Sequence, residues 1–132
     1  LKGLVPDSLF GATKYLDPIR QASSQAERLK KVEHCDMVIC LSHLGYKYRD
    51  NKVSDEILAR ESEHIDLIIG GHTHTFFDAP VVYKNKTGSG VVVNQVGWAG
   101  IVLGRMEFAF QRNKQKNLEA AHSVVIGKKT GE

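Results

Sequence analysis

The organisation of this chain follows from one stretch, residues 65–74. It reads Ile65-Asp66-Leu67-Ile68-Ile69-Gly70-Gly71-His72-Thr73-His74. The apolar run has the length and branched composition of a buried strand. Two glycines follow the run and let the backbone come close to a ligand. Two histidines, one residue apart, come directly after the glycines. The stretch therefore predicts a strand whose carboxyl end carries two candidate metal ligands.

A second apolar run lies upstream and has the same arrangement. It reads Asp36-Met37-Val38-Ile39-Cys40-Leu41-Ser42-His43, and its near-continuous apolar character predicts a parallel strand buried on both faces. A helical segment that begins after Ser54 separates the two runs. Strand, helix and strand imply two parallel neighbours joined by a right-handed connection. Open α/β folds keep ligand sites at the carboxyl edge of such strands, so we expect His43, His72 and His74 to converge there and bind metal.

The chemistry of imidazole supports this expectation. Histidine is a ligand for Zn and for other first-row transition metals. Neighbouring parallel strands are about 4.8 Å apart, so histidines at their ends can lie close together. In an extended turn His72 and His74 point in different directions, which suits two metals better than one. A single histidine past a strand is more often an ordinary polar residue, and His34 and His64 follow helices, whose C-termini favour cations.

The other segments predict a consistent order of elements. Asp17-Pro18 begins a helix that runs to about Glu33 with one apolar face. Further strands are expected at 79–83, 91–96, 101–111 and 120–126, turns at 85–90 and 112–117, a loop at 1–13 and a frayed tail at 127–132. The predicted fold class is α/β, with parallel strands and crossover helices whose sheet continues into antiparallel hairpins.

Composition limits the class of protein. The 132 residues suffice for one domain, and the net charge of +3 is mild. The basic residues are scattered, which indicates a solvated surface and not a nucleic-acid interface. No run approaches the roughly 18 apolar residues of a membrane span. Cys35 and Cys40 should point to opposite sides of a strand entry, so we expect no disulfide between them. The chain begins at Leu1, not Met, so we expect a piece of a longer protein, with any targeting segment outside it.

Several motifs together resemble a known enzyme family. They are Leu41-Ser42-His43-Leu44-Gly45, the strand that ends in Gly71-His72-Thr73-His74, Asn94-Gln95-Val96-Gly97-Trp98-Ala99-Gly100, and Leu103-Gly104-Arg105. From about residue 1 to 126 the chain resembles the C-terminal half of the catalytic domain of calcineurin-like metallophosphoesterases. The bacterial 5′-nucleotidase and 2′,3′-cyclic-nucleotide phosphodiesterase group is the most similar branch. The resemblance implies a four-layer α/β fold, of which residues 1–132 form the C-terminal half.

The resemblance also implies a two-metal site. In this family two divalent ions (Mn, Zn, Fe, Co or Ni) activate water for attack on phosphorus. The implied function is hydrolysis of phosphate monoesters, with 5′-nucleotides as the expected substrates. By this resemblance His43 and His72 bind one ion and His74 binds the other. Many members of the branch work outside the cytoplasm, which implies a periplasmic or extracellular location.

Three further residues are candidates for supporting these histidines. A metal-ligating imidazole usually donates its other ring N–H to a neighbouring polar group, which fixes the orientation of the ring. By the resemblance, Ser42, Asp78 and Asn94 are the candidates for that role.

The family's other motifs are missing from this chain. Its D-x-H, G-D-x-x and G-N-H-E/D motifs should all precede Leu1, and the sequence contains no Gly-Asp pair and no Asn-His pair. The bridging Asp, the metal-binding Asn and the histidine that protonates the leaving group are expected there, so no catalytic residue is assigned within this chain. We expect the isolated chain to be inactive or nearly so. We also expect it to expose a sheet edge and apolar surface through which it can form dimers.

Two other classes of protein stay open. One is a non-catalytic metal-binding or interaction scaffold of the same fold. The presence of His43, His72 and His74 argues against it, because a decayed site would have no need of all three. The other is a structural zinc domain, which would lack a fourth ligand, since neither cysteine is expected near the histidines.

Overall fold

The computed structural model describes residues 6–111 and 116–127. Its elements are, in chain order, α1 Asp7–Phe10, α2 Pro18–Lys31, β1 Ile39–Leu41, α3 Asp55–Glu61, β2 Leu67–Ile69, β3 Val81–Lys84, β4 Gly90–Asn94, β5 Val102–Phe110 and β6 Lys116–Val125. Three segments with an expected conformation lie outside the described residues: 1–5 of the N-terminal loop, 112–115 of the hairpin tip and 128–132 of the tail.

The α2 helix begins where the sequence predicts. The Asp17 side chain accepts a hydrogen bond from the Arg20 amide (2.9 Å), and Pro18 occupies the first helical turn. Both features satisfy the free amides at a helix start. The helix ends at Lys31, slightly before the expected end at Glu33.

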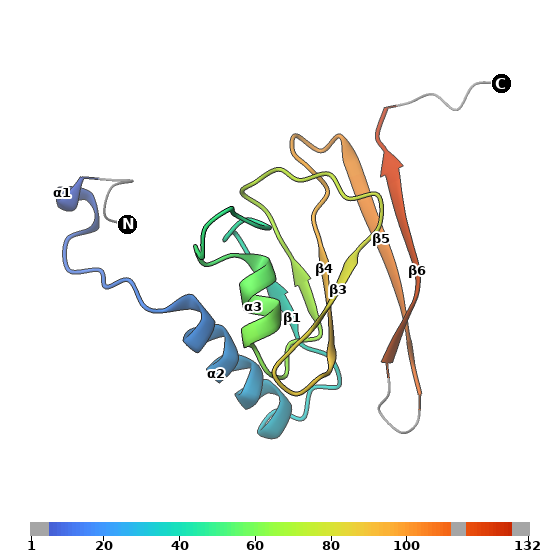
Figure 1. Cartoon of the computed structure of the whole chain (residues 1–132), viewed down its shortest axis with the longest axis horizontal. Helices are drawn as coiled ribbons and strands as arrows, with labels where there is room; N and C mark the ends of the chain where they lie inside the picture. Colours follow the sequence, from blue (N-terminus) through green and yellow to red (C-terminus); the bar gives the residue numbers. More distant parts are fainter. Residues whose placement is uncertain (1–5, 112–115, 128–132) are drawn as a thin grey trace.

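The short α1 helix corrects the expected N-terminal loop. Its single turn includes a hydrogen bond from the Leu9 amide to the Pro6 carbonyl (2.9 Å). The ring of Pro6 presets a φ close to the helical value, which favours a turn at this point. In Figure 1 α1 lies apart from the sheet, and Leu9 is exposed, so this helix does not contribute to the core.

The main sheet has the strand order β1-β2-β4-β3. β1 is parallel to β2, and β2 is parallel to β4, whereas β3 is antiparallel to β4. The connection from β1 to β2 contains α3, as parallel neighbours require. The predicted strand–helix–strand unit and the α/β fold class are confirmed.

Helices α2 and α3 cover one face of the main sheet (Figure 1). The buried apolar side chains form one cluster, made of Ala26, Val38, Leu58, Ala59, Ile65, Ile68, Tyr83, Val91 and Val93. Burying each Val, Leu or Ile side chain of the cluster contributes about 1.5–3 kcal/mol. This cluster therefore holds the central strands and fixes where their carboxyl ends lie.

The opposite face of the sheet is only partly covered. Leu67 and Val92 are register partners on this face, and both are buried. Phe108 and Leu118, from β5 and β6, line the same hollow as Val92. The β5–β6 hairpin therefore covers the middle of this face.

The edge of the same face is open. Ile39, Leu41 and Ile69 are 50%, 80% and 39% exposed, and we call these three residues the β1–β2 patch. The prediction that the first strand is buried on both faces is wrong for β1. It is the edge strand of the sheet, so its outward side chains have no neighbouring strand or hairpin beside them within the described residues.

The β5–β6 hairpin does not continue the main sheet as expected. It forms a separate two-stranded sheet, visible beside β3 and β4 in Figure 1. Gly97, Ala99 and Gly100 all have left-handed backbone (φ 71°, 58° and 69°), which turns the chain away from the direction of β4. The sixth strand already begins at Lys116, within the expected turn, and a β-bulge interrupts the pairing at Glu107.

The two cysteines are close in the sequence but do not form a disulfide. Cys35 and Cys40 are both free, as predicted. Among the helices within residues 6–111 and 116–127, none has the length and apolar character needed to cross a bilayer.

Candidate metal centre at the carboxyl edge of the sheet

The carboxyl ends of β1 and β2 lie side by side. Leu41 and Ile69, the last residues of these strands, are register partners in the parallel pair. The Ser42 amide extends the pairing with a hydrogen bond to the Ile69 carbonyl (2.9 Å). His43 follows at once on β1, and residues 70–75, which we call the histidine loop, follow on β2. Both histidine-bearing segments therefore leave the sheet at the same edge.

At this edge His43 and His72 form a pair, and His74 lies apart from them. The rings of His43 and His72 meet edge to face, with centroids 5.2 Å apart. The His74 ring instead stacks on the exposed Trp98, with centroids 6.1 Å apart. Among the residues that the structure describes, no three His, Cys, Asp or Glu side chains are grouped so that they could bind one ion together. The structure therefore pairs His43 with His72 and does not group all three histidines around one point.

The pair is chemically suited to a divalent transition metal. Two neighbouring imidazoles are common ligands of Zn and related ions, and His43, His72 and His74 are all exposed. A Cβ on Gly71 would lie 3.2 Å from His43 Nδ1. Because glycine has no side chain, the His43 ring can pack against the histidine loop. The residues present therefore fit part of a metal-ligand set.

The backbone of the histidine loop is left-handed at both histidines. His72 has φ 69° and His74 has φ 53°. The Thr73 amide donates to the Gly71 carbonyl (2.8 Å) and closes a three-residue turn around His72. Turns of this hand are strained for residues other than glycine, and such strain is concentrated at functional sites. The loop is therefore tightly folded, whereas the sequence predicted an extended turn.

Two buried polar residues beneath the loop were not assigned to the site from sequence. Asp55 is 0% exposed and Gln95 is 1% exposed. Gln95 Nε2 donates to the Gly71 carbonyl (2.8 Å) and to Asp55 Oδ2 (3.1 Å). Asp55 Oδ1 accepts a hydrogen bond from Ser42 Oγ (2.5 Å). Burial raises the pKa of the Asp55 carboxyl, although the hydrogen bonds from Ser42 and Gln95 act in the opposite direction.

The three predicted supporting residues differ in what they contact. Ser42 is half-buried, and its hydroxyl donates to Asp55 and not to an imidazole. Asn94 is 6% exposed, and its carbonyl accepts from the Gly70 amide (2.9 Å), which anchors the start of the histidine loop. Asp78 is exposed and makes no hydrogen bond or ion pair with the described residues. Hydrogen bonds to Asp78 therefore do not orient the histidines in this structure.

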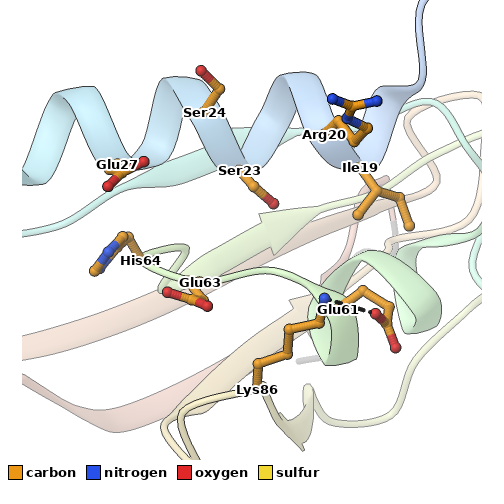
Figure 2. A pocket seen from close by; sticks show the side chains of 9 residues that line it. All are labelled: Ile19, Arg20, Ser23, Ser24, Glu27, Glu61, Glu63, His64 and Lys86. Atoms are coloured by element: carbon orange, nitrogen blue, oxygen red, sulfur yellow. Dashed lines mark ion pairs between the residues drawn. The ribbon is translucent and has the colours of Figure 1, made fainter.

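A charged groove of about 360 Å³ lies away from this edge. Figure 2 shows Ser23 and Ile19 on α2 pointing toward the opposite wall, which carries Glu63, His64 and the ion pair of Lys86 with Glu61 (3.0 Å). Every buried side-chain nitrogen or oxygen among the described residues has a hydrogen-bond partner. No buried polar group in this groove therefore lacks a partner, and we interpret the groove as a solvated surface.

Solved structures with the same fold identify the class of protein. The chain is similar to the 5′-nucleotidase precursor of Thermus thermophilus, with a TM-score of 0.67 and 30% identity over 82% of this chain and 22% of that one. It is also similar to the NAD nucleotidase (NadN) of Haemophilus influenzae, with a TM-score of 0.70 and 25% identity over 85% of this chain and 24% of that one. The structural neighbours of this part of the fold belong to the metallophosphoesterase superfamily.

Within that superfamily the relatives are 5′-nucleotidase-type phosphoesterases. The trifunctional nucleotide phosphoesterase protein YfkN of Bacillus subtilis is 34% identical over 94 residues, which are 71% of this chain and 6% of that protein. The 5′-nucleotidase of Vibrio cholerae is 28% identical over 138 residues, covering 91% of this chain and 25% of that protein. No family model matches the sequence. The chain is a relative of the 5′-nucleotidases, and it spans a quarter or less of the length of these two proteins.

Proposed function

We propose that residues 1–132 are the C-terminal half of the catalytic domain of a longer metal-dependent phosphoesterase. In that protein the chain would contribute His43, His72 and His74 to a site that hydrolyses phosphate monoesters. The single observation that carries the proposal is the pairing of the His43 and His72 rings at the carboxyl edge of the sheet, 5.2 Å apart. The similarity to 5′-nucleotidases supports nucleotides as the substrate class.

The proposed site holds two divalent ions, of Mn, Zn, Fe, Co or Ni. His43 and His72 would bind one ion, and His74 would bind the other. Bound divalent ions lower the pKa of water and neutralise charge that develops on the phosphoryl oxygens. The left-handed backbone at His72 and His74 presents the two imidazoles from a tight loop. The hydrogen bond from the Gly70 amide to the Asn94 carbonyl fixes the base of that loop. A location outside the cytoplasm, periplasmic or extracellular, belongs to the same proposal and rests on the family resemblance.

Hydrolysis of 5′-AMP and of a chromogenic phosphodiester tests the function. We expect the longer protein to turn over at least one of them when Mn²⁺ or Zn²⁺ is added. The 132-residue chain should show no turnover above the metal-only background, because no catalytic acid is assigned within it. Turnover by the chain alone would overturn the half-site proposal. Absence of turnover in the longer protein would instead favour a non-catalytic metal-binding or interaction scaffold.

Self-association through the β1–β2 patch is a further expectation for the isolated chain. Leu41 is 80% exposed on the edge strand of the sheet, and an open apolar edge favours pairing with a second copy. We expect size-exclusion chromatography to show a dimer at high concentration, and Leu41→Lys to shift the chain to the monomer. Val82→Lys is the matched control, because Val82 is 57% exposed on β3, at the other edge. A clean monomer of the unmodified chain at high concentration would contradict this expectation.

A further inference from the structure

A buried polar chain connects the two histidine-bearing segments. Its members are Ser42, Asp55 and Gln95, which we call the buried relay. Ser42 adjoins His43, and its hydroxyl donates to Asp55 (2.5 Å). Asp55 accepts at its other oxygen from Gln95 (3.1 Å), and Gln95 reaches the histidine loop at the Gly71 carbonyl (2.8 Å). The relay thus spans from the end of β1 to the end of β2 through side chains alone.

The direction of every hydrogen bond in the relay is determined by its ends. The Thr75 amide can only donate, and it donates to Gln95 Oε1 (3.0 Å). This orients the Gln95 amide so that its NH₂ group faces Asp55 and the loop carbonyl. Asp55 must then accept at Oδ2. At Oδ1 it accepts the Ser42 hydroxyl proton, and Ser42 Oγ accepts from the Leu44 amide (3.2 Å). An aspartate side chain at position 55 and an amide at position 95 therefore satisfy all of these groups, whereas an amide at position 55 would not.

The histidine loop is also pressed directly against the relay. A Cβ added at Gly70 would overlap Asp55 Oδ2 and would also come close to the Gln95 side chain. Gln95 Oε1 additionally accepts from the Thr73 hydroxyl (3.2 Å). The loop is therefore in contact with the relay at its glycines and at both of its threonines.

A buried carboxylate is costly unless it is paired and hydrogen-bonded. Asp55 is fully buried and forms no salt bridge with the described residues, although His43 exerts a Coulomb attraction on it. Well-packed apolar residues would stabilise a core at least as well as a buried charge without an ionic partner. A fully satisfied polar network instead rigidifies and specifies one arrangement of the groups that it joins. The groups joined here are the segments that carry His43 and His72.

We propose that Asp55 and Gln95 are positioning residues that set the placement of His43 relative to His72 and His74. They touch neither imidazole through any hydrogen bond described here and act through Ser42 and through the backbone of the histidine loop. The placement itself does not depend on metal. Only its consequence for metal affinity rests on the function proposed above.

Asp55→Asn tests the relay in the 132-residue chain without metal. The new NH₂ group must face either the Gln95 donor or the Ser42 hydroxyl, so at least one donor loses its acceptor. We expect NMR to show loss of the nuclear Overhauser effect between the His43 and His72 rings. Hydrogen exchange of the Thr75 amide proton should also become faster. We expect a rate at least about tenfold above the rate that the loss of global stability alone would produce. Asp50→Asn is the matched control, because Asp50 is exposed in the loop after β1.

A core variant separates positioning from a general loss of stability. Val91→Ala removes bulk from a fully buried side chain at the far end of β4 and should destabilise the chain while keeping the ring-to-ring signal. Ser42→Ala removes the hydrogen bond from Ser42 to Asp55 and leaves the packing intact. It replaces Asp55→Asn as the test variant if Asp55→Asn fails to fold. In the double variant Asp55→Asn/Gln95→Glu, the new amide at position 55 can donate to the new carboxylate at position 95. We therefore expect a smaller loss of the ring signal and of Thr75 protection than in Gln95→Glu alone. A relay variant that keeps both the ring signal and the Thr75 protection of the unmodified chain would overturn the proposal.

Titration with Zn²⁺ alone distinguishes this inference from the proposed function. Groups that orient metal-ligating histidines typically change metal affinity by about 10–100-fold, and we expect Asp55→Asn to weaken Zn²⁺ binding to this extent while Val91→Ala does not. If the longer protein, stripped of metal, binds no Zn²⁺ but Asp55→Asn in the 132-residue chain still loses the ring signal, the positioning role stands and the metal proposal fails. If the relay variants keep the ring signal and the Thr75 protection and bind Zn²⁺ as tightly as the unmodified chain, the positioning role is wrong and the metal proposal stands.

Discussion

His72→Ala in the longer protein is expected to lower kcat for 5′-AMP hydrolysis at least about a hundredfold. This figure is a lower limit, because changes to groups that merely support metal ligands already cost about 10–100-fold. His72 forms one half of the His43–His72 pair, 5.2 Å between centroids. Alanine removes the imidazole while keeping a Cβ at a position whose φ is 69°, so the backbone strain of the histidine loop is nearly unchanged. The loss can therefore be assigned to the ligand and not to relaxation of the loop.

The control for this prediction is another exposed histidine of the same chain. His122 lies on β6, in the sheet that does not carry the candidate site. We expect His122→Ala to keep kcat within about twofold of the unmodified protein, in line with the small effects of surface substitutions. Steady-state rates at saturating 5′-AMP, together with the metal content of each purified variant, provide the measurement. Full activity of His72→Ala with normal metal content would remove His72 from the proposed ligand set.

Gly70→Ala is expected to destabilise the chain by about 3–5 kcal/mol. The added Cβ would overlap Asp55 Oδ2 and approach the Gln95 side chain. Asp55 is 0% exposed, so its carboxylate has no free space into which it can move. The methyl group must either displace the carboxylate from its hydrogen bonds or push the strand end outward. In thermal unfolding, the midpoint should fall by more than about 10 °C.

Gly90→Ala is the matched control for this substitution. Gly90 begins β4, and its added Cβ would approach only the Val82 side chain, at 3.2 Å. Val82 is 57% exposed and can shift, so we expect less than about 1 kcal/mol of change. If overlap with the carboxylate is the cause, the Gly70→Ala and Asp55→Gly effects should be strongly non-additive, because Asp55→Gly removes the group that is struck. Additive effects would contradict this explanation.

Local sequence patterns predicted those features that depend on neighbouring residues alone. The start of α2 follows from the capping chemistry of Asp17 and Pro18, and the structure confirms it. The two apolar runs that end in His43 and in the histidine loop predicted parallel strands with a shared edge, because a strand–helix–strand unit has one favoured geometry. These predictions needed no knowledge of distant contacts, since the hydrophobic period and the turn residues lie within a few positions of each other.

Asp55 and Gln95 were missed as parts of the site because their roles arise from long-range contacts. From sequence, Asp55 was an acidic residue in the first turn of a helix, and Gln95 was one polar residue near the end of a predicted strand. Their side chains meet across a separation of forty positions. A polar side chain at the end of the buried run Val91–Val93 was the signal available for Gln95, but it does not say which partner the side chain finds.

The sequence alone therefore determined that this chain is an α/β fold with histidines at one sheet edge, because periodicity, caps and glycines act locally. Tertiary packing decided three things that no local pattern contains. It left β1 at the edge of the sheet, so that the β1–β2 patch is exposed. It separated β5 and β6 into their own sheet. It also brought His43 to His72 and left His74 beside Trp98. The physical reason is that these features depend on contacts between residues far apart in the sequence. The strained turn at His72, for example, lies against Gln95, which bonds to Gly71, Thr73 and Thr75 and is itself hydrogen-bonded to Asp55.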